Sequence, residues 1–232
     1  MNAPSRNHVI PGREEPVLPE PGNHVVLGTP LTGPWPKGTE VIYLAGGCFW
    51  GVERIMWRQP GVVATSVGYM GGTTPNPTYQ EVCTARTGHA ETVLVAYNPV
   101  VAGRGGEALL RAFWENHDST RLNRHGNDIG PQYRSAVWTT TPEQYAVATA
   151  TLKAFQSELA RLGLGRSVTT IDPASMQYAE FGGPYYLAED YHQGYLEKNP
   201  GGYCNHGPNG VTCPVGVANL PSQVDVLPPQ QV

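Results

Sequence analysis

The chain has 232 residues, of which 40% are hydrophobic and 15% are charged, and its formal net charge is -4. This length is enough for one domain with a core of its own, and the small negative charge argues against nucleic acid as the main partner. No apolar run approaches the ~20 residues of a membrane-spanning helix, and residues 1–20 lack the apolar segment of a signal peptide. We therefore expect a cytoplasmic protein that binds neither membranes nor nucleic acid.

The predicted elements lie between two irregular ends. Residues 1–38 are rich in Pro and Gly and have no periodicity, which predicts an irregular N-terminal arm, and residues 215–232 predict a similar C-terminal tail. Apolar runs predict strands at 41–45, 62–69, 90–97, 133–139 and 167–171. Apolar residues at helical spacing predict helices at 48–59, 106–117 and 142–162.

The order of these elements is β-α-β-β-α-β, followed by one more helix. This order is typical of the split β-α-β, or ferredoxin-like, arrangement, in which helices pack on one side of a mixed or antiparallel sheet. We therefore predict an α+β fold, a two-layer sandwich formed by a single domain over residues 39–214.

Cys48 stands where the first predicted strand gives way to the first helix. The preceding Gly46 and Gly47 allow a sharp turn and leave room beside the sulfur. Free N–H groups and a partial positive charge at a helix N-terminus favour the thiolate. Phe49 and Trp50 would form an apolar wall next to it. We interpret Cys48 as a reactive thiolate; the alternative is a buried structural cysteine.

Glu91 stands at the start of the third predicted strand and shares a face with Val93, Val95 and Tyr97, all residues that commonly point inward. A carboxylate in this position lies either at a solvated rim or inside a pocket. Burial would raise its pKa and keep it protonated near neutral pH, ready to donate a proton.

Three further polar side chains are candidates for binding a substrate. Tyr79 and Tyr133 each carry a hydroxyl that can donate a hydrogen bond, although twelve tyrosines make packing the commoner role for any one of them. Asp128 precedes the fourth strand and could equally be a turn residue.

The C-terminal segment contains two cysteines, Cys204 and Cys213, among Gly, Asn and Pro residues that suggest mobility. Mobile cysteines downstream of a reactive one point to thiol–disulfide exchange. The alternative is a zinc site with His206, but the spacing matches no common zinc pattern. Cys83 is most simply a thiol packed in the core.

Six motifs, in this order along the chain, are typical of one enzyme family: GGCFWG, GGTTPNPTYQEVC, TGHAE, FWENHD, NDIGPQYRS and NPGGYC. Together they resemble the A-class peptide-methionine (S)-S-oxide reductases from about residue 40 to residue 214. The resemblance implies that residues 39–214 are a catalytic reductase domain that repairs oxidised proteins. It also implies thiol-dependent reduction of methionine S-sulfoxide, free or in proteins, with thioredoxin as the reductant and no metal or organic cofactor. We expect a monomer.

The resemblance also implies roles for the residues around the sulfoxide. Cys48 matches the nucleophile that attacks the sulfur, and Glu91 matches the acid that protonates the oxygen, so that methionine leaves and Cys48 becomes a sulfenic acid. Tyr79 and Tyr133 match hydroxyls that bind the same oxygen, and Asp128 matches a polar residue of the pocket.

The remaining roles concern the substrate's methyl group and the recycling of the enzyme. Phe49 and Trp50 match the pocket that holds the methyl group. Cys204 would condense with the sulfenic acid to a disulfide, and Cys213 would then attack Cys204 and move the disulfide to the surface, where thioredoxin reduces it.

Two other functions remain open on the sequence. A cysteine hydrolase would pair Cys48 with His192, a spacing that loosely resembles papain-like proteases, although their glycine-alanine-cysteine context is absent. A redox sensor or a module that binds methionine peptides would use the same cysteines without releasing a product. We interpret His192 as a structural histidine in an aromatic cluster.

Overall fold

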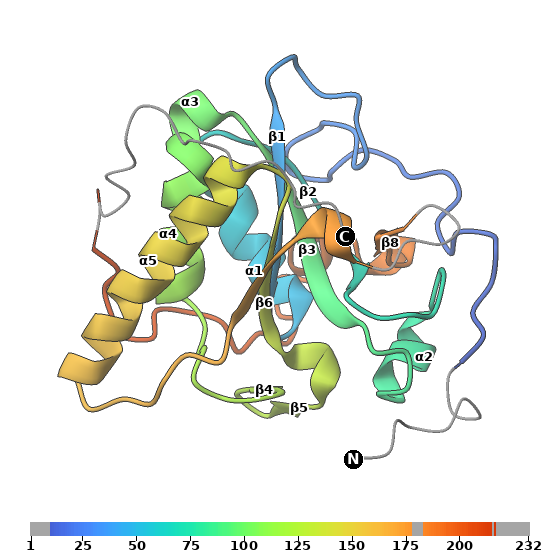
Figure 1. The fold of residues 1–232 in the computed structure, drawn as a ribbon. Helices are drawn as coiled ribbons and strands as arrows, with labels where there is room; N and C mark the ends of the chain where they lie inside the picture. The colour runs from blue at the N-terminus through green and yellow to red at the C-terminus, as the bar shows by residue number, and fades with distance from the viewer. Residues whose placement is uncertain (1–9, 178–182, 215, 217–232) are drawn as a thin grey trace, which may run out of the picture.

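A computed structural model of the protein describes residues 10–177, 183–214 and 216. Its main sheet has six strands in the order β7-β6-β1-β3-β2-β8 (Figure 1). The strands are β1 (Glu40–Gly46), β2 (Val62–Met70), β3 (Ala90–Tyr97), β6 (Ser135–Thr139), β7 (Thr170–Pro173) and β8 (Tyr185–Leu187). Strands β6 and β7 are parallel and the other neighbouring pairs are antiparallel, so the sheet is mixed.

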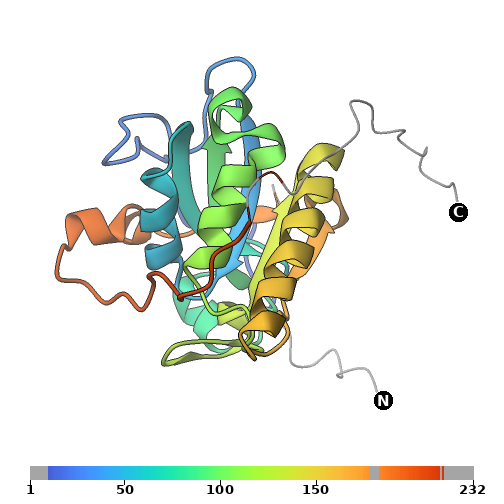
Figure 2. The ribbon, with the colours of Figure 1, turned by 90° about the vertical axis from the view of Figure 1, so that its left-hand side faces the viewer.

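Three helices cover one face of this sheet (Figure 2). They are α1 (Phe49–Trp57), α4 (Glu107–Glu115) and α5 (Pro142–Arg161). Each helix turns apolar side chains inward, and these meet the apolar side chains of β1, β2, β3 and β6 in one continuous core. Helix α5 begins at Thr141, whose hydroxyl accepts a hydrogen bond from the Gln144 N–H and so satisfies a free donor of the first turn.

The remaining elements are short and connect these layers. They are the helices α2 (Tyr79–Cys83), α3 (Pro99–Ala102) and α6 (Tyr195–Lys198), the hairpin strands β4 (Arg124–His125) and β5 (Asp128–Ile129), and the 3-10 turns η2 (Arg104–Gly106), η3 (Pro131–Tyr133), η4 (Ala174–Met176) and η5 (Asp190–His192). Within the described ranges, no helix has the length and apolar character needed to cross a bilayer.

Residues 10–39 wrap around the edge of the sheet without forming a helix or a strand, apart from one isolated bridge. Trp35 packs against β2 and β3 on the face away from the helices. His24 reaches the helix side, where its Nε2 lies 2.7 Å from Oγ1 of Thr65 and 3.9 Å from Oε1 of Glu53 in α1. This segment therefore covers apolar surface that a two-layer sandwich would leave open.

The predicted α+β class is confirmed, and each predicted strand and helix is present, the strand at 90–97 with the predicted bounds and the others with shifted ends. The fourth predicted strand starts only at Ser135, because residues 131–133 form turn η3. The fifth starts at Thr170. Strand β8 has only three residues, which is too short for periodicity to reveal. Of the predicted tail at 215–232, only Gly216 lies among the described residues.

The ends of two strands bring the main candidate residues to one end of the sheet. Leu44 of β1 pairs with Val93 of β3, so the last residues of β1 lie beside the first residues of β3. Because the chain leaves β1 at Gly46 and enters α1 at Phe49, the residues between them stand at the same end of the sheet as Glu91.

Candidate active site

Cys48 is the N-cap residue of α1 and is 7% exposed. The preceding Gly47 has a φ of 98°, and a Cβ atom at this position would overlap the ring of His125. A Cβ atom at Gly51, in the first turn of the helix, would overlap the ring of His206. These glycines therefore let two imidazole rings close over the start of the helix beside Cys48.

The thiol of Cys48 is held in its protonated form. Burial is the main cause that raises its pKa; Glu91, where it is ionised, and more weakly Asp128 raise it further. Hydrogen bonds from the backbone N–H groups of Trp50 and Gly51 lower the pKa, as expected at a helix N-terminus, but they do not offset burial. The prediction that the helix holds Cys48 as a thiolate is therefore wrong for this resting site.

Glu91 is 2% exposed, so it is buried and does not lie at a solvated rim. Its Oε2 accepts a hydrogen bond of 2.9 Å from the backbone N–H of Phe49, the first residue of α1. Burial raises the pKa of Glu91 to about 8, against the Phe49 hydrogen bond, which lowers it. At neutral pH the carboxyl group is therefore mostly protonated and can act as a proton donor.

Two tyrosines that belong to different elements, Tyr79 and Tyr133, lie near Glu91. Tyr79 begins α2, where its backbone N–H donates to Oε1 of Glu189 at 2.9 Å, and Tyr133 ends turn η3. Both side chains are partly buried. Burial, followed by the charge of Glu91, raises the pKa of each hydroxyl. Both hydroxyls therefore stay protonated and can donate hydrogen bonds.

Asp128 is more than a turn residue. It lies in hairpin strand β5, and its Oδ1 accepts a hydrogen bond of 3.1 Å from the hydroxyl of Tyr203. Its Oδ2 is buried and has no hydrogen-bond partner among the described residues. A buried carboxylate oxygen without a partner is available to a polar group of a ligand.

Phe49, Trp50 and His192 form an aromatic cluster next to Cys48. Phe49 is 1% exposed, whereas Trp50 is partly exposed and stacks on Tyr195 with 3.8 Å between ring centroids. The Trp50 indole N–H donates to Nδ1 of His192 at 3.1 Å, and burial lowers the pKa of His192 to about 4, so the imidazole is neutral. In the described structure His192 is hydrogen-bonded to Trp50 and not to Cys48, which disfavours the thiol–imidazole pair of a cysteine hydrolase.

Cys204 lies against α1. Its Sγ accepts a hydrogen bond of 3.0 Å from Nη2 of Arg54. Further along the same segment, Nε2 of His206 lies 2.7 Å from the carbonyl oxygen of Gly46, and the His206 ring stacks on His125 with 4.0 Å between centroids. These contacts hold Cys204 beside the start of α1.

Cys213 has different surroundings. It is 1% exposed, and its sulfur lies 3.9 Å from the carbonyl oxygen of Thr151 in α5. Its backbone N–H donates to Oε1 of Glu115 in α4 at 3.0 Å. Burial, reinforced by the charge of Glu115, raises the pKa of Cys213 to about 12. The Cys213 thiol therefore packs into the core in this state, and the predicted mobility of its segment stays a prediction.

The separate surroundings of Cys204 and Cys213 disfavour a zinc site that joins them through His206. Within the described parts of the chain, no group of three or more His, Cys, Asp or Glu side chains could hold a metal ion.

Comparison with known proteins shows the family of this chain. A family model described as "Peptide methionine sulfoxide reductase" matches residues 40–212. The chain belongs to this family.

Relatives and solved structures agree with the family model. The curated "Peptide methionine sulfoxide reductase MsrA" of Salinispora arenicola is 57% identical over 212 residues, which cover 90% of this chain and 91% of the relative. The "Peptide methionine sulfoxide reductase MsrA 1" of Caulobacter vibrioides is 51% identical over 217 residues, covering 94% and 95%. The solved methionine sulfoxide reductase A of Corynebacterium diphtheriae is 45% identical with a TM-score of 0.75, covering 90% and 96%. This chain is thus an oxidoreductase of the A class.

The sequence did not single out three side chains around the reductase site, namely Arg54, Glu189 and Tyr203. Glu189 accepts hydrogen bonds from the Tyr79 N–H and, at 3.0 Å, from the Tyr69 hydroxyl, so it ties α2 to β2. The sequence around Glu189, AEDYHQGY, mixes acidic and aromatic residues, and this mixture was the one feature of the sequence that could have pointed to Glu189. Arg54 and Tyr203 were recognisable only from the residues that they contact.

The prediction that Cys83 packs in the core of the reductase is wrong. Cys83 is exposed, and its thiol shares a hydrogen bond with the side chain of Tyr79. Helix α2 has only five residues, and Val82 is the one that points into the core. The neighbouring Cys83 therefore points outward.

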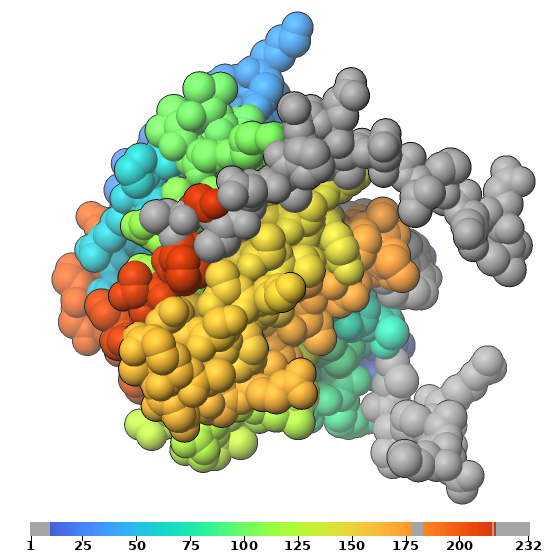
Figure 3. Space-filling model, turned by 60° about the vertical axis from the view of Figure 1, so that its left-hand side comes forward, coloured from blue at the N-terminus to red at the C-terminus, as the bar shows by residue number. Residues whose placement is uncertain are grey.

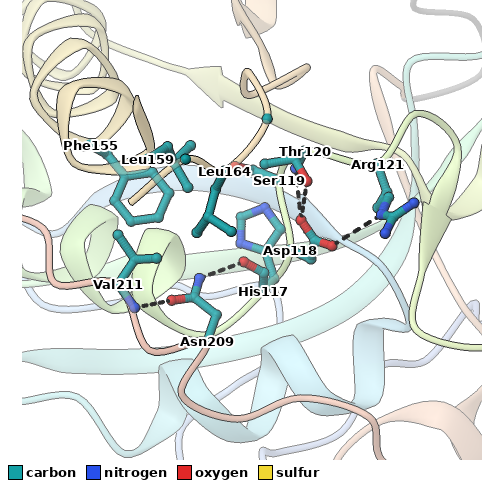
Figure 4. A pocket seen from close by; sticks show the side chains of 12 residues that line it. His117, Asp118, Ser119, Thr120, Arg121, Phe155, Leu159, Leu164, Asn209 and Val211 are labelled. Carbon is teal, nitrogen blue, oxygen red and sulfur yellow. Dashed lines mark hydrogen bonds and ion pairs between the residues drawn. The ribbon is translucent and has the colours of Figure 1, made fainter. Parts of the chain in front are cut away.

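A cavity of about 510 Å³ opens at the C-terminal ends of α4 and α5 (Figure 4). No predicted site residue lines it. Asn209 closes one side of the cavity, where its Nδ2 donates to the carbonyl oxygens of Trp114 and His117 at 2.7 and 2.8 Å. Figure 3 shows the segment that follows, in red, lying on the surface beside α5.

Proposed function

We propose that this reductase converts methionine S-sulfoxide, free or in proteins, to methionine, with Cys48 as the nucleophile. The observation that carries the proposal is the buried Glu91 carboxyl group, whose pKa is raised to about 8 at the N-terminus of the helix that follows Cys48. Together with the protonated hydroxyls of Tyr79 and Tyr133, it supplies a cluster of hydrogen donors next to a sulfur nucleophile.

The reaction needs these groups because a sulfoxide sulfur becomes electrophilic when its oxygen is protonated or strongly hydrogen-bonded. Glu91 gives its proton to the sulfoxide oxygen while the Cys48 sulfur attacks, and the thiol proton returns to Glu91. The S–O bond of the sulfoxide breaks and the oxygen ends on Cys48 as a sulfenic acid, so the cysteine is oxidised and methionine is released. Tyr79 and Tyr133 bind the oxygen during this step.

The raised pKa of the Cys48 thiol gives this mechanism a further feature. The free enzyme keeps Cys48 as a thiol, which protects it from oxidants that need a thiolate. When a substrate arrives, its oxygen takes the proton of Glu91. The carboxylate that remains then accepts the proton of the Cys48 thiol, so the thiol loses its proton only when a substrate is bound.

The methyl group of the substrate packs against Trp50, with Phe49 buried behind it, and Asp128 contributes its free oxygen to the polar side of the pocket. The stacking of Trp50 on Tyr195 and its hydrogen bond to His192 support this assignment, since they fix the indole in one orientation.

Recycling follows the two remaining cysteines of the proposed pathway. Cys204 condenses with the sulfenic acid, Cys213 then attacks Cys204, and thioredoxin reduces the final disulfide. The position of Cys204 beside α1 supports the first exchange. The second exchange requires Cys213 to leave its site against α4 and α5.

Three general features belong to the same proposal. The order β6-β1-β3-β2, with β3 between β1 and β2, supports a ferredoxin-like core. This core belongs to a reductase domain at residues 39–214, which follows an arm at 1–38 and precedes a tail at 215–232. Four free cysteines support action in the reducing cytoplasm. We expect a monomer.

The experiment that tests this function is the reduction of the two separate epimers of a blocked methionine sulfoxide with dithiothreitol. We expect methionine from the S epimer only, and no product from the Cys48→Ser protein. Inactivity towards both epimers would overturn the proposal. Binding without released methionine would indicate a sensor or a binding module, and cleavage of a peptide amide would indicate a hydrolase.

A further inference from the structure

Arg54 is a charged side chain near the site that the proposed mechanism does not use. It lies in α1, is partly buried, and donates a hydrogen bond of 3.0 Å to the sulfur of Cys204. In the described part of the chain, no carboxylate forms an ion pair with Arg54. Its positive charge is therefore directed at the Cys204 sulfur and is not neutralised by a partner.

The segment that carries Cys204 is fixed on both sides of the cysteine. Before it, the Tyr203 hydroxyl donates to Asp128 at 3.1 Å. After it, His206 lies 2.7 Å from the carbonyl oxygen of Gly46. Both anchors stand at the end of the sheet that carries Cys48, so the contact with Arg54 belongs to an ordered segment next to the nucleophile.

The surroundings of the cysteines differ in the charged group that bonds to the sulfur. Cys48 lies near the carboxyl groups of Glu91 and Asp128, and Cys213 lies near Glu115 and Arg111, but neither sulfur accepts a hydrogen bond from a charged side chain among the described residues. Cys204 instead accepts a hydrogen bond from a guanidinium group. A cation that donates to a sulfur stabilises negative charge on it, and the thiolate is the attacking species in disulfide formation.

We propose that Arg54 is a catalytic residue of the recycling step, in which it stabilises the Cys204 thiolate that attacks the sulfenic acid on Cys48. This inference rests on the proposed function. In the step, the Cys204 sulfur forms a bond to the Cys48 sulfur as the Cys48 S–O bond breaks. The leaving hydroxide takes up the proton lost by the Cys204 thiol and departs as water, while Cys204 is oxidised and the Cys48 sulfur is reduced.

The test separates the two chemical steps in a single turnover of the full chain. Fully reduced protein is mixed with one equivalent of methionine S-sulfoxide, and released methionine and dimedone-reactive sulfenic acid are followed over time. In Arg54→Gln, methionine release should keep its normal rate and amplitude. Loss of the sulfenic acid should slow by roughly 10- to 100-fold, the usual effect of losing a charge-assisted hydrogen bond.

Two further variants show whether charge is the cause. Arg54→Lys keeps the positive charge and should retain most of the rate of sulfenic acid loss. Arg58→Gln removes the same charge from an exposed position at the end of the same helix and should behave like the wild type.

The pH dependence distinguishes stabilisation of the thiolate from a structural role. In Arg54→Gln, the rate of sulfenic acid loss should rise more steeply with pH than in the wild type and approach the wild-type rate in alkaline solution, because hydroxide can then remove the proton of the attacking thiol. A deficit of equal size at every pH would overturn the proposal, because it would show that Arg54 only positions the segment.

The remaining outcomes are also decisive. If the wild-type protein releases no methionine, the proposed function fails and the inference fails with it. If methionine release is normal and Arg54→Gln loses its sulfenic acid within about twofold of the wild-type rate, Arg54 has no role in recycling. A variant that is slow in releasing methionine would place Arg54 in the first step, which also contradicts the proposal.

Discussion

Cys48 and Cys213 are both nearly inaccessible to solvent, at 7% and 1% exposure, but the structure buries them in different ways. Cys48 stands between a strand and a helix of the core, where backbone hydrogen bonds hold the chain on both sides. The segment 203–214 contains no helix and no strand, and individual bonds such as those of Asn209 hold it against α4.

This difference bears on what each region can do. A site built from the ends of core elements keeps its geometry through a reaction, because moving it would disrupt the core. A segment held by a few side-chain bonds can open locally at a small cost in free energy. The proposed mechanism needs both properties, since Cys48 must meet fixed donors whereas Cys213 must leave its place to reach Cys204.

The largest effect is expected from removing the nucleophile. Cys48→Ser should fold normally and lose all measurable sulfoxide reduction, because a serine hydroxyl is a much weaker acid and nucleophile than a thiol and cannot be oxidised to a sulfenic acid. The measurement is methionine release under excess dithiothreitol, with thermal unfolding as the check on folding. Cys83→Ser, which changes an exposed thiol, is the matched control and should keep full activity. Substantial activity in Cys48→Ser would contradict the assignment.

Removing the proton donor at the rigid site should have the next largest effect. Glu91→Gln should lower the rate of methionine release by roughly 10²- to 10⁴-fold, the usual contribution of general acid catalysis. The pKa of Glu91 is raised to about 8, so the donor is protonated below that pH, and the wild-type rate should fall as pH rises through it. Glu91→Gln should lack this fall.

A matched pair of controls sharpens the Glu91 result. Tyr79→Phe and Tyr133→Phe each remove one hydroxyl and leave the other donors, so each should cost less than Glu91→Gln. A Glu91→Gln enzyme within a few-fold of the wild type would mean that the sulfoxide oxygen receives its proton from another group.

Changes in the C-terminal segment should affect recycling and leave the first turnover intact. In Cys213→Ser, one equivalent of methionine should form at the normal rate, while turnover with thioredoxin should become slow because the disulfide stays at Cys48–Cys204. In Cys204→Ser, the sulfenic acid should persist and react with dimedone. Peptide mapping of the oxidised wild type should find Cys204–Cys213, and a disulfide that includes Cys83 would contradict the pathway.

The smallest effect tests the release of Cys213 directly. Asn209→Ala removes hydrogen bonds to the carbonyl oxygens of Trp114 and His117, which should lower the free energy of local opening by about 1–2 kcal/mol. Alkylation of Cys213 in the reduced protein should then accelerate by roughly 10-fold, since each 1.4 kcal/mol changes the open population about tenfold. Alkylation of Cys48 should not change. Equal acceleration at both cysteines would show that the two regions open together.

The sequence alone determined most of the helices and strands and the place of Cys48 between β1 and α1. Local rules were enough for this, because apolar periodicity marks strands and helices, and a Gly-Gly-Cys run between a strand and a helix places Cys48 at the helix start. The placement of Glu91 at the start of β3 followed in the same way. Short or aromatic-rich segments, such as β8 and the region around Glu189, carried too little periodicity to be predicted.

The tertiary structure alone decided the exposure of the cysteines and the direction in which the pKa of Cys48 is shifted. The helix N-terminus favours a thiolate at Cys48, but side chains distant in sequence bury the sulfur, and desolvation outweighs the helix. Cys83, which the sequence predicts in the core, is exposed, and Cys213, which stands in a segment without helix or strand, is buried. Solvent exposure and local charge depend on what packs around a residue, and contacts between distant segments such as Arg54 and Cys204 exist only once the chain has folded.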